Sequence, residues 1–361
     1  MLLPGDPAPH FKAATPSNPT YSFGSVAGRY VLLAFLPSDD AAQAHALALS
    51  ALRARRSLFD DERCCVFGVL RDPGLIAAAQ DEIPGIRWIL DADGAVFAAH
   101  EMVGADGTET PGWILLDPNL RVLFSAPFEA VDTVLGAVAG LPAIDQYAQT
   151  ALHAPVLIVP RVFEPAFCKQ LIDHYEARGG ESSGFMRDVG GLTVLLNDPG
   201  HKRRSDVILE DETLQMQIRA RMVRRLNPEI TKAFQFLPTR IERYLVARYD
   251  AAELGFFRPH RDNTTLGTAH RKFAVTINLN PGAYEGGDLR FPEFGSRTYR
   301  APLGGAVVFS CSLLHEATPV TEGRRYAFLP FLYDDEAAKV REANARFLAA
   351  EGPRYAVSGA K

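Results

Sequence analysis

The sequence predicts a two-domain α+β protein, in which an α/β domain is followed by a domain built mainly of strands. Its 361 residues are enough for about two domains. The charge is also divided: residues 1–150 carry 9 Lys and Arg against 18 Asp and Glu, whereas residues 151–361 carry 29 against 25. The net charge of −5 is therefore about −9 in the first part and +4 in the second, which favours two separate units.

The first domain, expected over residues 1–145, alternates strands with helices. Short apolar runs typical of buried parallel strands occupy residues 30–36, 64–70 and 87–94. Residues 112–126 have the pattern of a hairpin that turns at Asp117-Pro118-Asn119. Helical periodicity occupies residues 41–59, and a closing helix is predicted at roughly 129–140.

A junction at residues 141–155 leads to the second domain, expected over residues 152–361 with its core at about 241–333. A helix is predicted from Glu164-Pro165 to Gly179-Gly180, because proline suits the first turn of a helix and glycine its end. Two further helices are expected at 212–226 and 228–237. From 241 to 333, strands follow at short intervals between glycine and proline turns, which indicates an antiparallel sandwich or jelly roll. The last element, at 334–352, is an amphipathic helix capped by Asp334 or Asp335.

Composition argues against several classes of function. No stretch is apolar enough to cross a membrane, and the first ten residues lack the basic flank and apolar core of a signal peptide. Four cysteines without a CxxC motif argue against a disulfide framework and indicate a reduced, cytoplasmic location. There is no concentrated Lys/Arg stripe of the kind that binds nucleic acid.

The stretch 179–206 is rich in glycine, serine and charge. Such long irregular segments are commonly functional lids or disordered, so we expect substrate selection here. Its basic run, Lys202-Arg203-Arg204, is interpreted as solvated loop residues, with the alternative that it holds an acidic or phosphorylated substrate.

Three residues of the second domain form a candidate metal site. His260 and Asp262 are two residues apart, so in a strand they project from the same face and can bind one ion. His315 would be the third ligand, brought near by the fold. Two imidazoles and one carboxylate on one side of an octahedron leave positions open, as in non-haem Fe(II) oxygenases.

Arg325 follows in RRYAFLPFLY, a run with the composition of a strand. Alternation places Arg325 on the inward face with Ala327 and Leu329, and Tyr326 and Phe328 on the other face. An inward guanidinium matches a carboxylate with two parallel hydrogen bonds. The adjacent Arg324 is the second candidate for this role.

Together these motifs resemble the catalytic core of the prolyl 4-hydroxylase-like family of Fe(II)/2-oxoglutarate dioxygenases. The resemblance is carried by Arg248-Tyr249, His-x-Asp-Asn at 260–263, Tyr-Glu-Gly-Gly-x-Leu at 284–289 and His-Glu-x-x-Pro-Val-Thr-x-Gly-x-Arg at 315–325. It implies a double-stranded β-helix, a form of jelly roll, with supporting helices.

The resemblance also implies the chemistry. His260, Asp262 and His315 would bind Fe(II), and Arg325 would anchor the distal carboxylate of 2-oxoglutarate, so these four are the expected catalytic residues. Tyr249 and Asn278 are further candidates for contacts to 2-oxoglutarate. The collagen and oxygen-sensing branches of the family have a tyrosine near the position of Asn278. The implied cosubstrates are 2-oxoglutarate and O2, with ascorbate as an accessory reductant.

Three functions are consistent with these residues. The first is hydroxylation of a prolyl or other residue in a protein or peptide, with succinate and CO2 as coproducts. The second is hydroxylation of a free amino acid or small metabolite. The third is a non-catalytic redox-fold adaptor with a vestigial iron site. Nucleic-acid demethylation is disfavoured, because the related family has a further arginine six residues after the 2-oxoglutarate arginine and this chain has Phe331.

The first domain resembles the thioredoxin fold, and more narrowly the peroxiredoxins, through PGDPAPHF, AGRYVLLAFLPS, FGVLRDP and TPGWILLDP. The resemblance implies a cis peptide bond at Thr110-Pro111. However, LPSDDAAQAHAL contains no cysteine where peroxiredoxins carry their reactive thiolate. Cys64 and Cys65 are interpreted as packing residues of a buried strand. The domain is therefore expected to be redox-inactive and to dock a protein substrate or a second subunit of a homodimer.

Overall fold

The computed structural model describes residues 2–38, 40–349 and 357–359, and the chain divides into two compact units. Unit 1 comprises residues 1–153 together with 292–296, and unit 2 comprises residues 154–291 and 297–361. The short segment 292–296 belongs to unit 1 through hydrogen bonds from the amide and hydroxyl of Ser296 to the Asp145 carboxylate, at 2.6 and 2.7 Å.

The elements of unit 1 alternate much as the apolar runs predict. Its strands are β1 (Lys12–Thr15), β2 (Asn18–Ser22), β3 (Tyr30–Phe35), β4 (Cys64–Leu70), β5 (Ile86–Leu90), β6 (Gly112–Leu116) and β7 (Val122–Pro127). Its helices are α1 (Ala41–Ala54), α2 (Pro73–Ala78), α3 (Ala95–Ala99) and α4 (Val131–Ala139).

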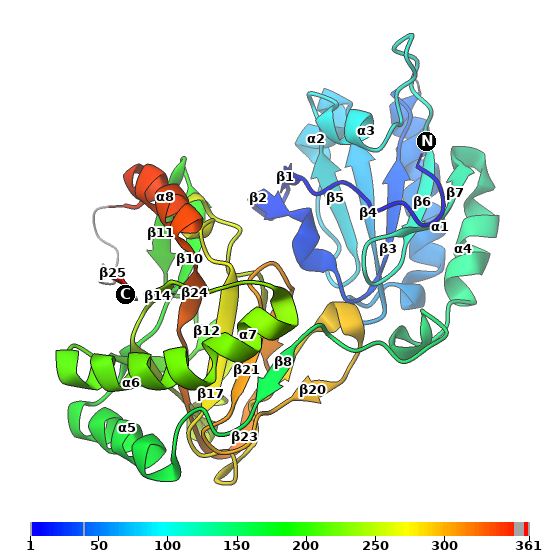
Figure 1. Cartoon of the computed structure of the whole chain (residues 1–361). Helices are drawn as coiled ribbons and strands as arrows, with labels where there is room; N and C mark the ends of the chain where they lie inside the picture. The colour runs from blue at the N-terminus through cyan, green and yellow to red at the C-terminus, as the bar shows by residue number, and fades with distance from the viewer. Residues whose placement is uncertain (1, 39, 350–356, 360–361) are drawn as a thin grey trace. The chain divides into compact units, whose positions relative to one another are not determined.

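These strands form a mixed sheet in the order β2-β1-β5-β4-β3-β6-β7 (Figure 1). Strands β3, β4 and β5 are parallel and almost entirely buried, which explains why their sequences are continuous apolar runs rather than alternating ones. The hairpin β6–β7 continues the sheet in the antiparallel sense. A core of parallel strands extended by an antiparallel hairpin agrees with the α/β domain expected for residues 1–145.

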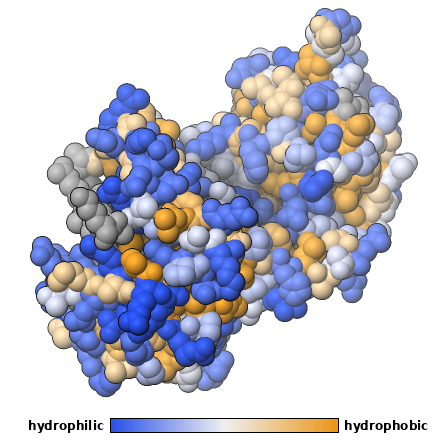
Figure 2. All heavy atoms as spheres, in the orientation of Figure 1, coloured by the Kyte–Doolittle hydropathy of each residue, from blue (hydrophilic) through white to orange (hydrophobic). Residues whose placement is uncertain are grey.

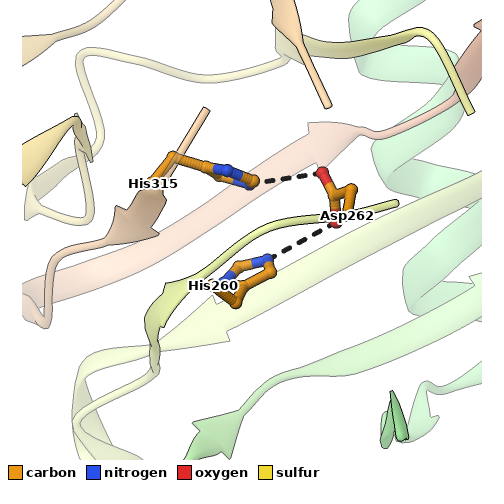
Figure 3. Close-up of side chains that lie close together, drawn as sticks. All are labelled: His260, Asp262 and His315. Carbon is orange, nitrogen blue, oxygen red and sulfur yellow. Dashed lines mark ion pairs between the residues drawn. The ribbon is translucent and has the colours of Figure 1, made fainter. Parts of the chain in front are cut away.

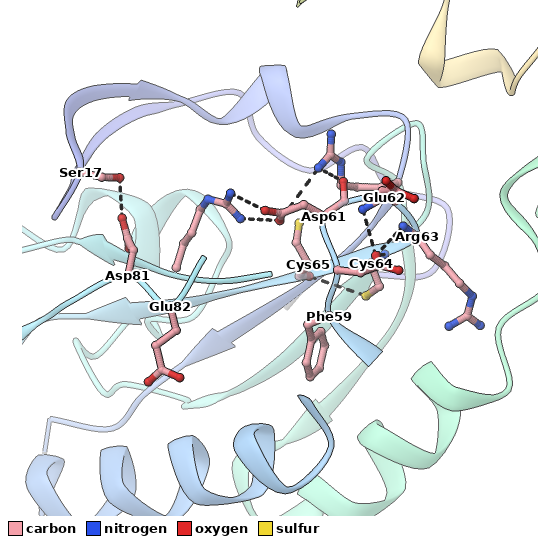
Figure 4. Close-up of polar contacts among 12 residues, drawn as sticks. Ser17, Phe59, Asp61, Glu62, Arg63, Cys64, Cys65, Asp81 and Glu82 are labelled. Atoms are coloured by element: carbon pink, nitrogen blue, oxygen red, sulfur yellow. Dashed lines mark hydrogen bonds and ion pairs between the residues drawn. The ribbon is translucent and has the colours of Figure 1, made fainter. Parts of the chain in front are cut away.

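The two adjacent cysteines of unit 1 are packing residues, as expected. Cys64 and Cys65 begin β4, are fully buried, and direct their sulfurs to opposite faces of the strand (Figure 4). Burial raises the pKa of Cys65 to about 12 and raises that of Cys64 well above its ordinary value. Neither thiol has the exposure or the low pKa of a reactive cysteine.

The peptide bond before Pro111 differs from the expectation. Among the described residues, the cis peptide bond is at Ile83-Pro84, and Thr110-Pro111 is trans. The resemblance in sequence around TPGWILLD therefore does not carry this backbone feature with it.

Unit 2 contains the remaining elements. Its strands are β8 (Leu157–Val159), β9 (Glu181–Ser182), β10 (Phe185–Val189), β11 (Leu192–Leu196), β12 (Lys202–Arg203), β13 (Ser205–Ile208), β14 (Arg240–Glu242), β15 (Leu245–Asp250), β16 (Phe256–His260), β17 (Phe273–Asn278), β18 (Tyr284–Gly286), β19 (Leu289–Arg290), β20 (Thr298–Tyr299), β21 (Ala306–Ser310), β22 (His315–Ala317), β23 (Val320–Phe328), β24 (Phe331–Tyr333) and β25 (Val357–Gly359). Its helices are α5 (Pro165–Arg178), α6 (Glu212–Arg225), α7 (Asn227–Phe234) and α8 (Asp335–Asn344).

The strands of unit 2 are paired antiparallel in two main sheets. The larger runs β25-β14-β24-β17-β23-β15-β13-β9, and the smaller runs β12-β16-β22-β19-β20. One face of the larger sheet packs against α5, α6 and α7 (Figure 1), and its residues include Tyr326 and Phe328. The opposite face carries Ala327 and Leu329 in a separate apolar cluster, so the predicted alternation along β23 is confirmed.

The stretch 179–206 is not the irregular segment that its composition predicted. It contains β9, the antiparallel hairpin β10–β11, and β12. Glycine at 190 and 191 supplies the positive φ values of the hairpin turn, so the glycine content reflects a tight turn rather than disorder. The basic run was also misjudged, because Lys202 and Arg204 are buried and only Arg203 is exposed.

No helix among the described residues is both long and apolar enough to span a membrane. The molecular face in Figure 2 mixes hydrophilic and hydrophobic residues.

A prediction follows from the packing of Gly68 in β4. A Cβ at Gly68 would lie 2.1 Å from Cζ3 of Trp88, whose side chain is almost completely buried and cannot move aside. Gly68→Ala should therefore destabilise unit 1 by about 1–3 kcal/mol. Denaturant unfolding followed by tryptophan fluorescence measures this unit alone, because Trp88 and Trp113 are the two tryptophans of the chain.

Gly136 of α4 is the matched control, since a Cβ there meets no atom within 4 Å. Gly136→Ala should leave the stability unchanged or raise it by up to about 1 kcal/mol, because alanine is the better helix former. If Gly68→Ala unfolds at the same denaturant concentration as the native chain, the packing described for Trp88 is wrong.

Candidate metal centre

The three sequence-predicted ligands come together in unit 2. His260 ends β16, Asp262 follows it, and His315 begins β22, which pairs with β16 so that His260 lies opposite His315. The carboxylate oxygens of Asp262 lie 3.5 Å from Nε2 of His260 and 3.3 Å from Nε2 of His315 (Figure 3). One ligand atom from each residue lies within 4.8 Å of the other two. Bonds of about 2.1 Å to one ion would bring such atoms to about 3 Å from each other, so the cluster fits a metal after a small contraction.

Hydrogen bonds fix the orientation of both imidazoles. Nδ1 of His260 lies 2.7 Å from the carbonyl oxygen of Arg258, and Nδ1 of His315 lies 3.0 Å from that of Leu313. A proton on Nδ1 satisfies each carbonyl and leaves Nε2 with a lone pair directed at the shared centre. This is the arrangement by which metal-bound histidines are usually held.

Asp262 is held through its backbone. Its amide donates to the carbonyl of Cys311 at 2.9 Å, and its own carbonyl accepts a hydrogen bond from Nη1 of Arg271 at 3.4 Å. Arg271 is in turn paired with Glu242 through two hydrogen bonds of 2.6 and 3.0 Å, and His270 contacts the same carboxylate at 2.7 Å. The Glu242–Arg271 pair is buried, so it forms a rigid support under the Asp262 backbone.

The electrostatics of the site favour the forms that bind a cation. Burial, and next the charge of His315, lower the pKa of His260 to about 4, so this imidazole is neutral near pH 7. Burial alone would raise the pKa of Asp262, but the neighbouring imidazoles outweigh it and hold the pKa well below its usual value. A neutral imidazole and an ionised carboxylate are the protonation states that a metal requires.

Aromatic rings enclose the two histidines. Phe257 stacks on His260 with ring centroids 3.5 Å apart, and Phe309 lies 4.5 Å from His315. These rings restrict rotation of the imidazoles and keep the site partly dry, which strengthens electrostatic interactions within it.

Arg325 lies on the inward face of β23, as alternation predicts. It is buried, pairs across the sheet with Tyr249 of β15, and its guanidinium lies 4.9 Å from the centre of the Tyr249 ring. Among the described residues, no carboxylate lies within ion-pair distance of Arg325. A buried guanidinium without an anion is costly, so this group has the character of a carboxylate-binding residue whose ligand comes from outside the chain.

The rival arginine is occupied elsewhere. Arg324 has a side chain that is 55 % exposed, and its Nε donates to the Asp250 carboxylate at 2.9 Å. The ranking of Arg325 above Arg324 therefore agrees with the geometry.

Asn278 also lies on the inward face, since β17 pairs Asn278 with Ala327. Its Nδ2 donates to the carbonyl of Ala301 at 2.9 Å, and its Oδ1 is buried without a partner among the described residues. One of the two N–H groups of this amide is thus already used, and the other can still donate to a carboxylate. Tyr249 and Asn278 both remain candidates for the contact to 2-oxoglutarate.

Sequence reasoning missed the groups that surround the three ligands. The Glu242–Arg271 pair joins residues far apart in the chain, and its members have no motif of their own. Lys202 and Arg204 were assigned to solvent because they occur in a basic run. Strand alternation could have predicted their burial. In a strand, the side chains of Lys202 and Arg204 lie on one face and that of Arg203 on the other.

Several known proteins are similar in sequence to this part of the chain. Residues 244–333 match the 2OG-Fe(II) oxygenase superfamily. A PKHD-type hydroxylase of Shewanella sp. (strain ANA-3) is 27 % identical over 184 residues, which cover 48 % of this chain and 76 % of the relative. A PKHD-type hydroxylase of Cupriavidus metallidurans is 34 % identical over 100 residues, covering 25 % of this chain and 43 % of that protein.

Solved structures similar to the chain include a Pseudomonas putida prolyl-4-hydroxylase, with 17 % identity, a TM-score of 0.37, and coverage of 52 % of this chain and 95 % of that one. Mycobacterium tuberculosis AhpC is similar with 17 % identity, a TM-score of 0.31, and coverage of 39 % and 93 %.

The support beneath Asp262 gives a testable prediction. Glu242→Ala leaves the Arg271 guanidinium buried without its anion, so unit 2 should lose about 3–5 kcal/mol of stability. Circular dichroism during denaturant unfolding follows both units, and the tryptophan fluorescence of unit 1 identifies the transition of that unit, since unit 2 contains no tryptophan. Asp335→Ala is the matched control: it removes the exposed carboxylate of the Arg240–Asp335 pair and should cost less than about 1 kcal/mol. Equal losses for the two variants would contradict the supporting role of Glu242.

Proposed function

We propose that the chain is an Fe(II)- and 2-oxoglutarate-dependent dioxygenase that hydroxylates a prolyl or other residue of a protein or peptide. The match of residues 244–333 to the 2OG-Fe(II) oxygenase superfamily supports this proposal. The observation that carries the proposal is the combination of two groups in unit 2. His260, Asp262 and His315 converge on one point, and Arg325 presents a buried guanidinium without an internal anion. The former suits a ferrous ion and the latter suits the carboxylate of a 2-oxo diacid.

The residues present fit Fe(II). Two imidazole nitrogens and one carboxylate provide three ligands, and the positions left open admit other ligands. When bound, the ion supplies the one-electron chemistry that couples O2 to the decarboxylation of 2-oxoglutarate. The ion would be held by three ligands whose positions are fixed. Backbone carbonyls orient the rings of His260 and His315, and Arg271 supports the backbone of Asp262. Asp262 keeps a carboxylate where halogenases of related type have a small residue, which favours hydroxylation.

Arg325 and Tyr249 would orient 2-oxoglutarate. The guanidinium can donate two parallel hydrogen bonds to the distal carboxylate, and the Tyr249 ring packs against the guanidinium and limits its movement. With its distal carboxylate bound by Arg325, 2-oxoglutarate would direct its 2-oxo acid group toward the three metal ligands. The coproducts would be succinate and CO2, with ascorbate as an accessory reductant.

The fold and the partners belong to the same proposal. The two sheets of unit 2 would form a double-stranded β-helix that encloses the metal ligands between them. Unit 1, whose described cysteines are buried, would serve to dock a protein substrate or a second copy in a homodimer. We place the protein in the cytoplasm, with no nucleic-acid or membrane partner. Hydroxylation of a free amino acid or small metabolite is the second candidate, because the buried ammonium of Lys202, described below, suits the carboxylate of a free amino acid as well as that of a peptide.

The metal site can be tested without turnover. Asp262→Ala and His260→Ala should each lower the affinity for Co(II) or Mn(II) by more than about 10²-fold, beyond the effect typical of residues that only support ligands. Calorimetric titration of the purified chain measures this. His201→Ala, which changes a histidine outside the cluster, should bind the metal as the native chain does. Unchanged metal affinity in the Asp262 variant would refute the site.

The cosubstrate site gives a separate prediction. Arg325→Met should raise the 2-oxoglutarate concentration needed for half-maximal succinate release by about 10²-fold, as expected for loss of a charge-assisted hydrogen-bonded pair. Metal affinity should stay unchanged. Arg324→Met, in which the exposed neighbour is changed, should alter the requirement less than about 2-fold. The reverse pattern would mean that Arg324 holds the diacid.

A further inference from the structure

Lys202 is a buried cation next to the metal ligands. It lies on β12, which pairs with β16 in a register that sets Lys202 opposite Phe257. Its exposed fraction is 7 %, whereas its neighbour Arg203 is exposed. Lysine is rarely buried without a partner of opposite charge. The position of Lys202 therefore requires an explanation.

The contacts of Lys202 use part of its hydrogen-bonding capacity. Its Nζ donates to Ser183 Oγ at 2.7 Å and to the carbonyl of Gly184 at 2.6 Å. The same Nζ lies 4.8 Å from the centre of the Phe257 ring. That ring stacks on His260, so a single aromatic side chain contacts both the ammonium and a metal ligand. An ammonium has three N–H groups, and two of them are accounted for.

The charge of Lys202 is not balanced. Among the described residues, no carboxylate lies within ion-pair distance of its Nζ. The nearby Asp206 carboxylate is paired with Arg204 at 2.6 Å. Two other charged groups influence the Lys202 ammonium, Arg243 and Asp262. Arg243 is also positive, and the Asp262 carboxylate is a proposed metal ligand. These neighbouring carboxylates are therefore engaged elsewhere, and the Lys202 ammonium has no anion of its own.

Burial makes this unpaired charge expensive. Desolvation, followed by the charge of Arg204, holds the pKa of the Lys202 ammonium well below its usual value. An anion that entered beside Nζ would reverse this shift, because an opposite charge within a few ångströms favours the charged form.

We propose that Lys202 binds a carboxylate of the substrate and so selects substrates that carry one near the carbon to be hydroxylated. The inference rests on the proposed dioxygenase function and adds a substrate class to it. A single free N–H and a single unpaired charge match one oxygen of a monoanion, whereas a phosphate dianion would call for several donors. The α-carboxylate of a free amino acid, the terminal carboxylate of a peptide and an acidic side chain all present this group.

The first experiment needs neither iron nor turnover. The protein is labelled with [ε-13C]lysine, and the Lys202 signal is identified by its absence from Lys202→Met. Titration with acetate should raise the pKa of Lys202 by about one unit or more, since a carboxylate beside the ammonium favours its charged form. Acetamide, which has the same shape without the charge, should leave the pKa unchanged. A Lys202 signal that acetate does not move more than acetamide does would overturn the proposal.

The second experiment distinguishes the sources of the carboxylate. Iron-loaded protein with saturating 2-oxoglutarate is given L-proline or L-prolinamide, a peptide ending in a prolyl carboxylate or its amide, and a prolyl peptide with an internal Glu or Gln. Succinate release above the rate without substrate should be at least about 10-fold greater for the carboxylate member of one pair, which converts to about 1.4 kcal/mol. Lys202→Met should remove that preference and Lys202→Arg should retain part of it.

Arg203→Met is the matched control, because it changes the adjacent basic residue, whose contacts lie at the surface. It should keep both the preference and the acetate response. If the native chain releases no succinate even without substrate, the proposed dioxygenase function fails. If it releases succinate but shows no preference for the carboxylate member of any pair, the role of Lys202 is refuted. A rise in the 2-oxoglutarate requirement of Lys202→Met would assign the lysine to the cosubstrate and overturn the proposal in a third way.

Discussion

The register between β16 and β22 is the constraint on which the site depends. It sets His260 directly opposite His315, although 54 residues separate them in the chain. Opposed residues in an antiparallel pair bring their side chains together on one face, and a slip of one residue would send one imidazole to the other face. The irregularity between Phe257 and His260 is part of the same arrangement, because it lets the strand turn toward Asp262 while Phe257 stays paired with Ala317. The proposed metal site therefore depends on the pairing of these two strands as well as on the identity of its three ligands.

The interior of unit 2 contains several charged groups, and they fall into two kinds. Glu242 with Arg271, and Arg204 with Asp206, are paired within the chain and serve to hold segments in place. Arg325 and Lys202 have no carboxylate within ion-pair distance among the described residues, whereas Asp262 lies between the imidazoles of His260 and His315. A folded domain tolerates unpaired buried charges only at considerable cost, which is commonly met where a ligand completes the site. The division between paired and unpaired charges thus identifies candidate ligand-binding residues without reference to any motif.

Local patterns in the sequence predicted much of this and failed in an understandable way. The alternation along β23 assigned Arg325 inward and Arg324 outward, and helix α5 begins at Pro165 and ends before Gly179 as its end signals indicate. These features depend on neighbouring residues. The burial of Lys202 and Arg204 depends instead on the pairing of β12 with β16 and of β13 with β15, partners about 40 to 55 residues away. Composition within the stretch 179–206 carries no information about such pairing, so a basic run was mistaken for a solvated loop.

The buried strands of unit 1 are explained by packing. The buried parallel strands β3 and β4 require continuous apolar residues, and that requirement is met whether or not a thiolate follows β3. Cys64 and Cys65 satisfy it as small hydrophobic residues, with thiols whose pKa values burial keeps far above neutrality. Packing alone explains why these cysteines are present. Unit 2 differs in this respect, because Arg325 and Lys202 are buried where packing alone would favour apolar side chains. We propose that each of them, and the half-buried Asp262, binds a ligand of opposite charge.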